Sequence, residues 1–542
     1  MVDESSANDG QSGWGDTYRS LVAATRQELG VTDLATLAVA AYLIGDDDAC
    51  ADAWSSAYER YLDSGDRAEA ALCSFWLALT LMLRGQMAHA NGWLNRSNGA
   101  IGDHLECAAS GYLLIPALLG ALDSGEPAGA ISLAEQANEI GARFDDPDLS
   151  ALATLGHGQA LIAQGDTDAG LGKLDEVMLS VEAGDVGPIA SGLVYCAVIL
   201  ECMQVFDLAR ASEWTNALDG WCQAQPDLVP YRGQCLVHQS QLRQAAGEWP
   251  EAAAAIALAC DRLSDPPHPA LGLAYYQQAE LLRMLGSVEA AADSFARASR
   301  AGHEPMPGLA LLDLARGDVR TASASIQRAL SEAGRPSGRV PLLSAAVEIL
   351  RAAGDREGAR SASEELAEIA AGSPSEVVQA MAKDAAGAVL LDDGDAAAAL
   401  SELRAAAGMW QKLKMPYEAS RAGVLVGLAC AGLSDETAAG LEFANAAAVF
   451  ASLGAEADLA RLRSLSEGSQ THSAVEANSA GLSPRELEVL SHVAAGRTSP
   501  EIAEELTISP HTVRRHLENI FVKLGVNNRA AATAYAYEHG LL

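Results

Sequence analysis

A turn that returns about every forty residues constrains this chain more than any other feature. From about Asp16 onward, an apolar stretch of helix length ends at a turn, and a second, alanine-rich stretch follows. The spacings between successive turns are 40, 40, 40, 41, 41, 39, 31, 37, 40 and 38 residues. The turn residues are Gly45, Gly85, Gly125, Gly165, Phe206, Gly247, Gly286, Gly317, Gly354, Gly394 and Gly432. Glycine at such a turn supplies the left-handed backbone that ends a helix.

This pattern predicts an all-α array of about eleven stacked helical hairpins over residues 16–465, a tetratricopeptide-like α-solenoid. The composition agrees, since 49% of residues are hydrophobic but only 5% are aromatic, which suits many closely packed helices. One spacing drops to 31 residues, between Gly286 and Gly317, across Pro305 and Pro307. We expect a truncated helix and a kink of the superhelix there.

Two segments lack the repeat. Residues 1–15 are predicted to be a disordered tail, and residues 466–481, rich in Ser, Ala and Asn, a flexible linker to a last domain at 482–542. No apolar run approaches the ~18 residues of a membrane helix. The acidic, polar N-terminus does not have the form of a signal peptide. We therefore expect a cytoplasmic protein with no membrane partner.

The last domain contains a helix-turn-helix pattern. Thr498 and Glu501 form a capping box that begins one short helix, and Ser509 and Pro510 are suited to begin the next. Apolar residues of the second helix recur on one face before its stop at Gly525, at Val513, Leu517, Ile520, Phe521 and Leu524. Its opposite face carries two arginines near the N-terminus. Such a unit lays its second helix in the major groove of DNA.

Two segments of this domain closely resemble the LuxR-type (NarL/GerE-like) DNA-binding domain of bacterial regulators. They are LSPRELEVL and EIAEELTISPHTVRRHLENIFVKLGV. The resemblance covers about residues 481–542 and implies a four-helix domain that binds double-stranded DNA as a homodimer, with the last helix at the dimer contact. It also implies that Arg514 and Arg515 reach base edges or phosphates, and that Thr512 and Val513 anchor the recognition helix. Many members have a phosphate-binding lysine where this chain has Pro500, so that contact is in doubt.

Two sets of DNA-contacting residues follow. The candidates for base-edge contacts are His511, Arg514, Arg515 and Glu518. The candidates for phosphate contacts are Thr498, Ser499, Ser509, Thr512, Lys523 and Arg529.

The charge of the chain is unevenly distributed. Residues 482–542 hold 6 Lys+Arg and 7 Asp+Glu, a net charge of −1, whereas the whole chain carries −36, which leaves −35 on the remainder. The array should therefore repel DNA. Specific binding would depend on a few placed arginines, and on two copies of the domain, rather than on bulk attraction.

No catalytic or metal constellation stands out. The nine cysteines form no CxxC pair and are expected to be reduced, buried thiols. The acidic runs Asp46–Asp48 and Asp392–Asp393 are better explained as turn and N-cap residues than as metal ligands. No GxxxxGK[ST] motif is present. We expect neither an enzyme nor a cofactor.

The end of the array also resembles a known group. MPYEASRA and FASLGAEADLAR, within about residues 409–465, are similar to the last hairpins of the large MalT-like LuxR regulators, whose NTPase domain has no counterpart in this sequence. That resemblance implies that the array takes up a small-molecule inducer, although a protein or peptide effector is nearly as well supported. The ligand-facing candidates, all aromatic residues on first helices, are Trp76, Tyr112, Tyr195, Tyr275 and Tyr276.

The sequence thus favours a bacterial transcription regulator whose helical array senses an effector. RNA polymerase is a further partner that this interpretation allows. The alternative is a solenoid scaffold that captures a protein partner, with the terminal domain used for dimerisation or localisation.

Overall fold

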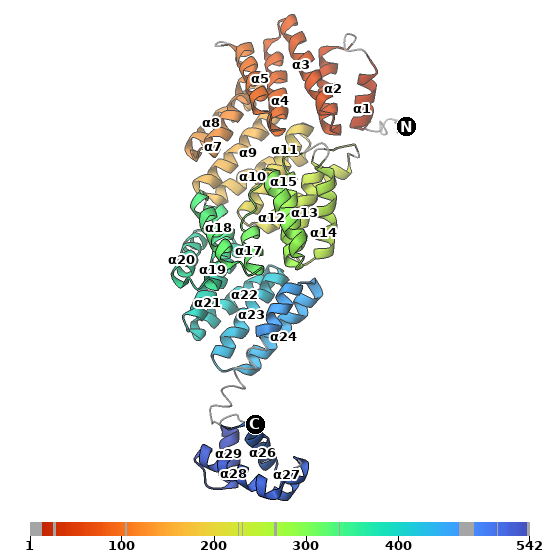
Figure 1. Ribbon diagram of the computed structural model, residues 1–542. Coiled ribbons are helices and arrows are strands. Elements are labelled where there is room, and N and C mark those ends of the chain that lie inside the picture. Colours follow the sequence, from red (N-terminus) through yellow and green to blue (C-terminus); the bar gives the residue numbers. More distant parts are fainter. Residues whose placement is uncertain are drawn as a thin grey trace, which may run out of the picture. The chain divides into compact units, whose positions relative to one another are not determined.

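Left-handed turn residues divide the array into hairpins, as the repeat predicts, in the computed structural model of the protein (Figure 1). The structure describes residues 13–24, 29–102, 106–225, 227–229, 231–264, 268–334, 336–465, 482–506 and 508–538. φ is positive at nine of the predicted turn glycines and at Phe206. The last turn differs from the prediction: Gly432 still belongs to its helix, and Ser434 adopts the positive φ of 62° two residues later.

An aspartate directly after the turn begins most of the second helices. Its carboxylate accepts a hydrogen bond from a backbone N–H of the first helical turn, which would otherwise be unpaired. Seven of the hairpin turns use this cap, at Asp46, Asp166, Asp207, Asp318, Asp355, Asp395 and Asp435. The prediction for Asp46 is therefore confirmed. Asp392 and Asp393 instead end a first helix and pair with Arg351 and Arg360, because the cap of that turn is Asp395.

Eleven hairpins follow α1 (Trp14–Val22) in the described residues. Their first helices are α2 (Val31–Ile44), α4 (Arg67–Leu83), α6 (Ala108–Tyr112) with α7 (Leu114–Asp123), α9 (Pro147–Gln164), α11 (Pro188–Gln204), α13 (Arg232–Ala245), α15 (Leu271–Met284), α17 (Gly308–Ala315), α19 (Pro336–Ala352), α21 (Glu376–Asp392) and α23 (Pro416–Gly432). Their second helices are α3 (Asp47–Ser64), α5 (Met87–Ile101), α8 (Pro127–Phe144), α10 (Thr167–Glu182), α12 (Leu208–Gln223), α14 (Trp249–Arg262), α16 (Val288–Arg300), α18 (Val319–Glu332), α20 (Arg356–Ala371), α22 (Ala396–Lys412) and α24 (Glu436–Leu453).

The two helices of each hairpin lie in different layers. First helices of successive hairpins contact one another directly. Examples are α9 with α11, α13 with α15, α19 with α21, and α21 with α23. Second helices pack against the first helices through small residues such as Ala399 and Ala406 of α22, which are fully buried. The first helices therefore form the inner layer of a tetratricopeptide-like α-solenoid. The truncated helix predicted after Gly286 is α17, only 8 residues long.

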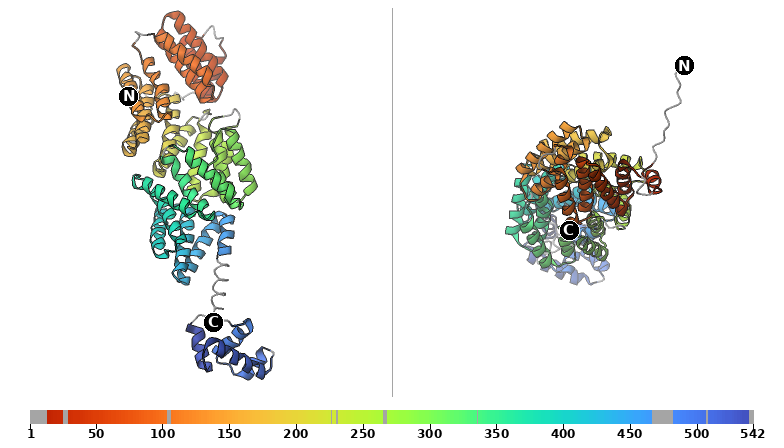
Figure 2. Two further views of the ribbon diagram at one scale, coloured as in Figure 1. Left: turned by 60° about the vertical axis from the view of Figure 1, so that its left-hand side comes forward. Right: turned by 90° about the horizontal axis from the view of Figure 1, so that it is seen from above.

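The array coils tightly enough for its turns to touch (Figures 1 and 2). With hairpins counted in chain order, Tyr231 of the sixth donates to Tyr42 of the first at 3.3 Å. The rings of Trp249 in the sixth hairpin and Tyr417 in the eleventh lie 5.2 Å apart. Contacts thus join hairpins that are five apart. Because the turns of the coil touch, the inner layer faces a shared interior instead of the open concave surface expected of a solenoid.

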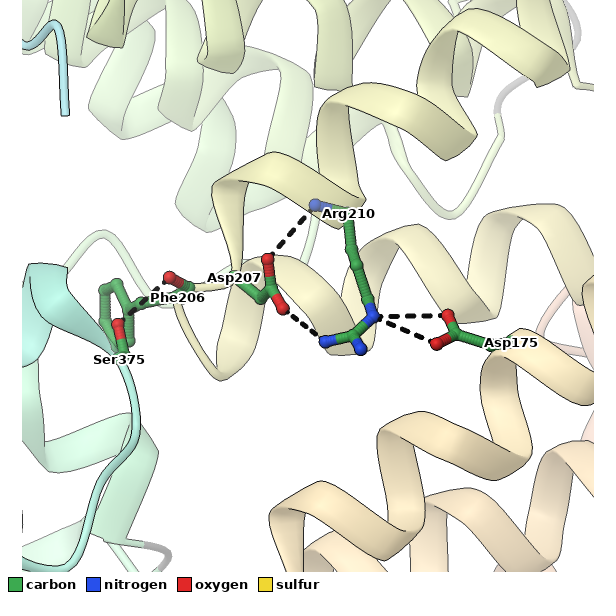
Figure 3. A network of polar contacts seen from close by, with 5 residues as sticks. All are labelled: Asp175, Phe206, Asp207, Arg210 and Ser375. Carbon is green, nitrogen blue, oxygen red and sulfur yellow. Dashed lines mark hydrogen bonds and ion pairs between the residues drawn. The ribbon is translucent and has the colours of Figure 1, made fainter.

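A third contact between turns involves the junction at Phe206, which stands where most junctions have a glycine (Figure 3). Ser375, just before α21 of the tenth hairpin, donates to the carbonyl oxygen of Phe206 in the fifth at 3.0 Å. The next residue, Asp207, caps α12 and binds the guanidinium of Arg210 at 2.6 Å. Arg210 also bonds Asp175 of α10, at 3.1 Å. The left-handed turn at Phe206 is therefore held from both sides.

The structure differs from the sequence-based expectation at the start of the fold and within the third hairpin. Residues 13–15 belong to the fold and not to a disordered tail, because Trp14 Nε1 donates to Gln225 Oε1 at 2.8 Å. The first helix of the third hairpin is broken between α6 and α7, since Pro116 has no N–H to donate to the carbonyl of Tyr112. Residues 1–12 and the predicted linker 466–481 lie outside the described residues.

Contacts divide the chain into two compact units, Met1–Glu456 and Ala457–Leu542. The second contains α26 (Pro484–Ala494), α27 (Ser499–Glu505), α28 (Pro510–Leu524) and α29 (Arg529–Glu538). In the described ranges no helix has the length and apolar character needed to cross a membrane. No disulfide joins any of the nine cysteines, and eight of them are buried.

Candidate nucleic-acid interface

The four C-terminal helices enclose a core of their own. Ile502 and Ala503 of α27 pack with buried residues of α28 at the predicted apolar positions, Val513, Leu517, Ile520 and Leu524. Phe521, also predicted to face inward, is half-buried against this core. Because the apolar face of α28 is fully used for packing, its opposite face is turned to solvent.

Side-chain caps fix where the two helices of the unit begin. The N–H and the hydroxyl of Thr498 both donate to Glu501 Oε2, at 2.6 and 2.7 Å, which confirms the capping box. Ser509 accepts from the N–H of Thr512 at 3.1 Å, and the two hydroxyl oxygens are 2.7 Å apart. The exposed hydroxyls of Thr498 and Ser509 thus lie at the N-termini of adjacent helices, where backbone N–H groups favour anions.

The residues predicted to contact bases share the exposed face of α28. His511, Arg514, Arg515 and Glu518 occupy positions i, i+3, i+4 and i+7, and all four are exposed. Among the phosphate candidates, Ser499 and Thr512 are half-buried. The N-terminal half of α28 therefore presents two cations, an imidazole and a carboxylate on one side.

Most of the cationic side chains in this unit already have partners. Residues 482–542 contain six Lys and Arg. Four of them bind protein groups. Arg485 donates to the carbonyl oxygen of Leu506, and Arg529 donates to that of Arg497. Arg497 pairs with the carboxylate of Glu505, and Lys523 pairs with the carboxylate of Glu486. Arg514 and Arg515 make no hydrogen bond or ion pair to any described residue. They are the two cations of this unit that remain available to a phosphate or a base.

Lys523 has a structural role that sequence reasoning missed. Its Nζ lies 2.6 Å from Glu486 Oε2, and the N–H of Ser483 donates to the same carboxylate at 2.7 Å. Burial alone would raise the pKa of Glu486, but the hydrogen bonds from Lys523 and Ser483 together lower it. Lys523 thus secures the start of α26. This geometry does not favour the predicted phosphate contact, and Arg529 is similarly engaged.

Replacing Lys523 with methionine tests that role. Methionine keeps the aliphatic stem but leaves the Glu486 carboxylate buried without its cation. We therefore expect the free energy of unfolding to fall by ~1–3 kcal/mol. The salt dependence of DNA binding should not change. The double variant Lys523→Met with Glu486→Gln should recover part of the stability. A salt slope reduced by about one counterion, at unchanged stability, would instead assign Lys523 to a phosphate.

Pro500 gives a second test of how this unit approaches DNA. It is exposed in the first turn of α27, at the position where the sequence resemblance implies a phosphate-binding lysine. Pro500→Lys should tighten binding to specific and random DNA alike, and steepen the salt dependence by about one counterion. Pro500→Ala is the matched control, because it removes the proline without adding charge. Identical salt titrations of all three proteins would show that this helix start does not approach the backbone.

The aromatic candidates in the array do not form one surface. Tyr112, Tyr195 and Tyr275 are buried between helices, which does not favour the prediction that they face a ligand. The Tyr112 hydroxyl donates to Asp146 at 2.8 Å, which explains its place in the core. Trp76 and Tyr276 are half-buried and remain candidates.

Comparison with known proteins identifies the last domain. Residues 480–536 match the family described as bacterial regulatory proteins, luxR family. The probable transcriptional regulatory protein NarL of Mycobacterium tuberculosis is 49% identical over 61 residues, which cover 11% of this chain and 28% of that protein. The transcriptional regulatory protein LiaR of Bacillus subtilis is 40% identical over 84 residues, which cover 16% of this chain and 36% of that protein. The chain thus spans only about a third of the length of these relatives.

Solved structures were also compared with the whole chain. The Cut9–Hcn1 hetero-tetramer of the APC/C matches with a TM-score of 0.39 and 12% identity, over 83% of this chain and 93% of that one. Yeast Tom70 matches with a TM-score of 0.34 and 14% identity, over 78% of this chain and 93% of that one.

Proposed function

We propose that this protein is a transcription regulator that binds DNA as a homodimer through its LuxR-type helix-turn-helix domain and senses an effector through its helical array. The observation that carries the DNA-binding half is the pairing of cations in the last domain. Four of six are held by protein groups, whereas Arg514 and Arg515 are exposed near the N-terminus of α28. The N-terminal residues of a recognition helix are those that reach base edges in the major groove.

The charge distribution supports regulation by the array. The DNA-binding domain carries −1 and the rest of the chain −35, so the array opposes binding wherever it lies within a Debye length of DNA, ~8 Å at physiological salt. An effector that favours one arrangement of the array over another would change the affinity for DNA. The change cannot exceed the effector's differential affinity for the two arrangements.

Selection of bound DNA from a random pool tests this function, with the full-length protein beside residues 481–542 alone. The shorter piece has its own buried core and should fold independently. We expect both proteins to select the same half-site, and the fragment to bind non-specific DNA at least as tightly as the full chain at low salt. Failure of both to enrich any sequence would favour the alternative, a scaffold whose last domain serves only dimerisation or localisation.

Equal affinity and equal salt slope for the two proteins would separate the two halves of the proposal. DNA binding would then stand, but the array would have no electrostatic influence on it. RNA polymerase is the partner expected of a DNA-bound activator, and co-purification on the selected operator would test that contact.

A further inference from the structure

Charged residues gather where first helices of the last hairpins meet. Glu280 and Arg283 of α15 lie on the inner layer beside α23, because Tyr417 and Arg421 of α23 both act electrostatically on Arg283. Glu348 of α19 reaches the same place, since Arg421 donates to its Oε2 at 2.5 Å. Asp384 of α21 and Glu418 of α23 complete the group. We call these six residues the interior charged cluster: Glu280, Arg283, Glu348, Asp384, Glu418 and Arg421.

The cluster contains more acids than bases. Glu280 binds Arg283 in bidentate fashion, at 3.1 and 2.9 Å. Glu348 has Arg421. Four carboxyl groups and two guanidinium groups give a formal charge of −2. The surplus lies on the two acids outside these ion pairs.

Asp384 and Glu418 each carry an oxygen atom without a donor. Asp384 Oδ2 accepts from the indole N–H of Trp410 at 2.6 Å, but its Oδ1 is shielded from solvent and has no hydrogen-bond partner in the described structure. Glu418 Oε2 is shielded and unpartnered in the same way. A buried acceptor left without a donor costs ~1–3 kcal/mol, and more when the group is charged. Each residue as a whole is half-buried, but the two unpartnered oxygen atoms are shielded from solvent.

The electrostatics of the pair agree with this geometry. Burial raises the pKa of Asp384 to about 7, against the lowering effect of Trp410 and Arg421. Burial also raises the pKa of Glu418 to about 7, and the nearby negative charge of Asp384 adds to that rise. A cation placed between the two carboxyls would favour the ionised form of both.

We propose that Asp384 and Glu418 bind the ammonium group of a small amine in the interior of the array. An ammonium group offers three N–H donors and one positive charge, which satisfy both orphaned oxygens and offset half of the surplus charge. A metal ion is disfavoured, because the described residues hold no group of three or more His, Cys, Asp or Glu placed to ligate one. Arg421, which lies against the face of Tyr417, would border the site.

This inference deepens the proposed function, on which it rests only for its effect on DNA binding. The amine would be the effector. Its two carboxyl groups come from hairpins ten and eleven, and the ion pairs around them come from hairpins seven, nine and eleven. Binding would therefore link the neighbouring first helices α21 and α23. The other half of the proposal, recognition by α28, does not depend on this site.

Calorimetric titration of the full-length protein at about pH 8 tests the site, with putrescine and spermidine as probes and butanediol as the uncharged control. We expect both amines to bind and butanediol not to bind. Asp384→Asn and Glu418→Gln should each weaken amine binding at least tenfold, equivalent to ~1.4 kcal/mol. Glu368→Gln, an exposed change of equal charge on α20, should have no effect.

Trp410 offers a second measurement that does not depend on heat. Because its indole N–H bonds Asp384, amine binding should change its fluorescence, and Trp410→Phe should remove that change. Thermal melts of every variant establish that it is folded. Absence of amine binding to the wild type, or binding that all variants retain, would overturn the proposal.

The same amines added to the DNA titration distinguish this inference from the proposed function. Binding that changes the affinity for the selected operator supports both. Binding that leaves DNA affinity unchanged supports the amine site but counts against sensing by the array.

Discussion

Replacing Arg514 and Arg515 together with alanine should abolish preference for the selected operator. Each arginine that contacts a base edge is worth ~1–3 kcal/mol of discrimination, so the double variant should lose ~30-fold or more in specific affinity. No neighbouring cation can substitute, since Arg485, Arg497 and Lys523 are bound to protein groups. Competition titrations of operator against random DNA measure the loss.

The single variants separate the two roles that an exposed arginine can have. A base contact should relax preference at one position of the half-site, whereas a phosphate contact should weaken all sequences equally and lower the salt slope by about one. Arg404→Ala on the exposed face of α22 is the control, because it removes the same charge from the array. If both single variants bind like the wild type, α28 does not dock as proposed.

Local chemistry explains why so much of the fold could be predicted. A glycine followed by aspartate specifies both the end of one helix and the cap of the next, and neither requires knowledge of distant residues. Even where glycine is absent, at Phe206, the period of the repeat located the turn. The exception is instructive: Gly432 is one of the small residues near the turn, but Ser434 is the residue that precedes the capping Asp435 and takes the left-handed conformation.

The coiling of the array could not be predicted in this way. Contacts such as Tyr231 with Tyr42 join residues 189 positions apart, and depend on a small rotation accumulated over five hairpins. For the same reason the sequence did not separate Tyr112, Tyr195 and Tyr275, which are buried, from residues that face the interior.

The DNA-binding domain shows the same limit on a smaller scale. The spacing of its apolar residues predicted which face of α28 is exposed, but not which cations are already paired. Lys523 is 37 positions from Glu486, so their contact depends on how α28 packs against α26. Asp384 and Glu418 were missed altogether, because each stands in an ordinary helical pattern and only packing places them together.

Those two carboxyls should give the protein an unusual dependence of stability on pH. In an unfolded chain they ionise near pH ~4, whereas burial raises the pKa of each to about 7 in the folded protein. Between these values the folded state holds more protons than the unfolded state. The free energy of unfolding therefore falls as pH rises from ~4 to ~7, and the loss is complete above the folded pKa values.

The variant Asp384→Asn with Glu418→Gln should remove this dependence. Asparagine can still accept from Trp410, and neither amide ionises. At about pH 8 the double variant should be ~2–4 kcal/mol more stable than the wild type. This figure is reduced from ~1.4 kcal/mol per pKa unit because the two carboxyls interact, so their shifts do not add in full. Near pH ~4 the two proteins should be equally stable. Urea unfolding at a series of pH values measures the difference directly.

The difference between the two curves isolates the pair, since all other titrating groups are common to both proteins. The facing charges, Arg421 with Glu348 and Arg283 with Glu280, form ion pairs in both proteins. The amine site predicts a further result: at about pH 8 saturating putrescine should stabilise the wild type and leave the double variant unchanged. A wild-type curve that is flat between pH ~4 and ~7 would mean that Asp384 and Glu418 ionise at ordinary pKa values, with donors that neutralise the cost of their burial.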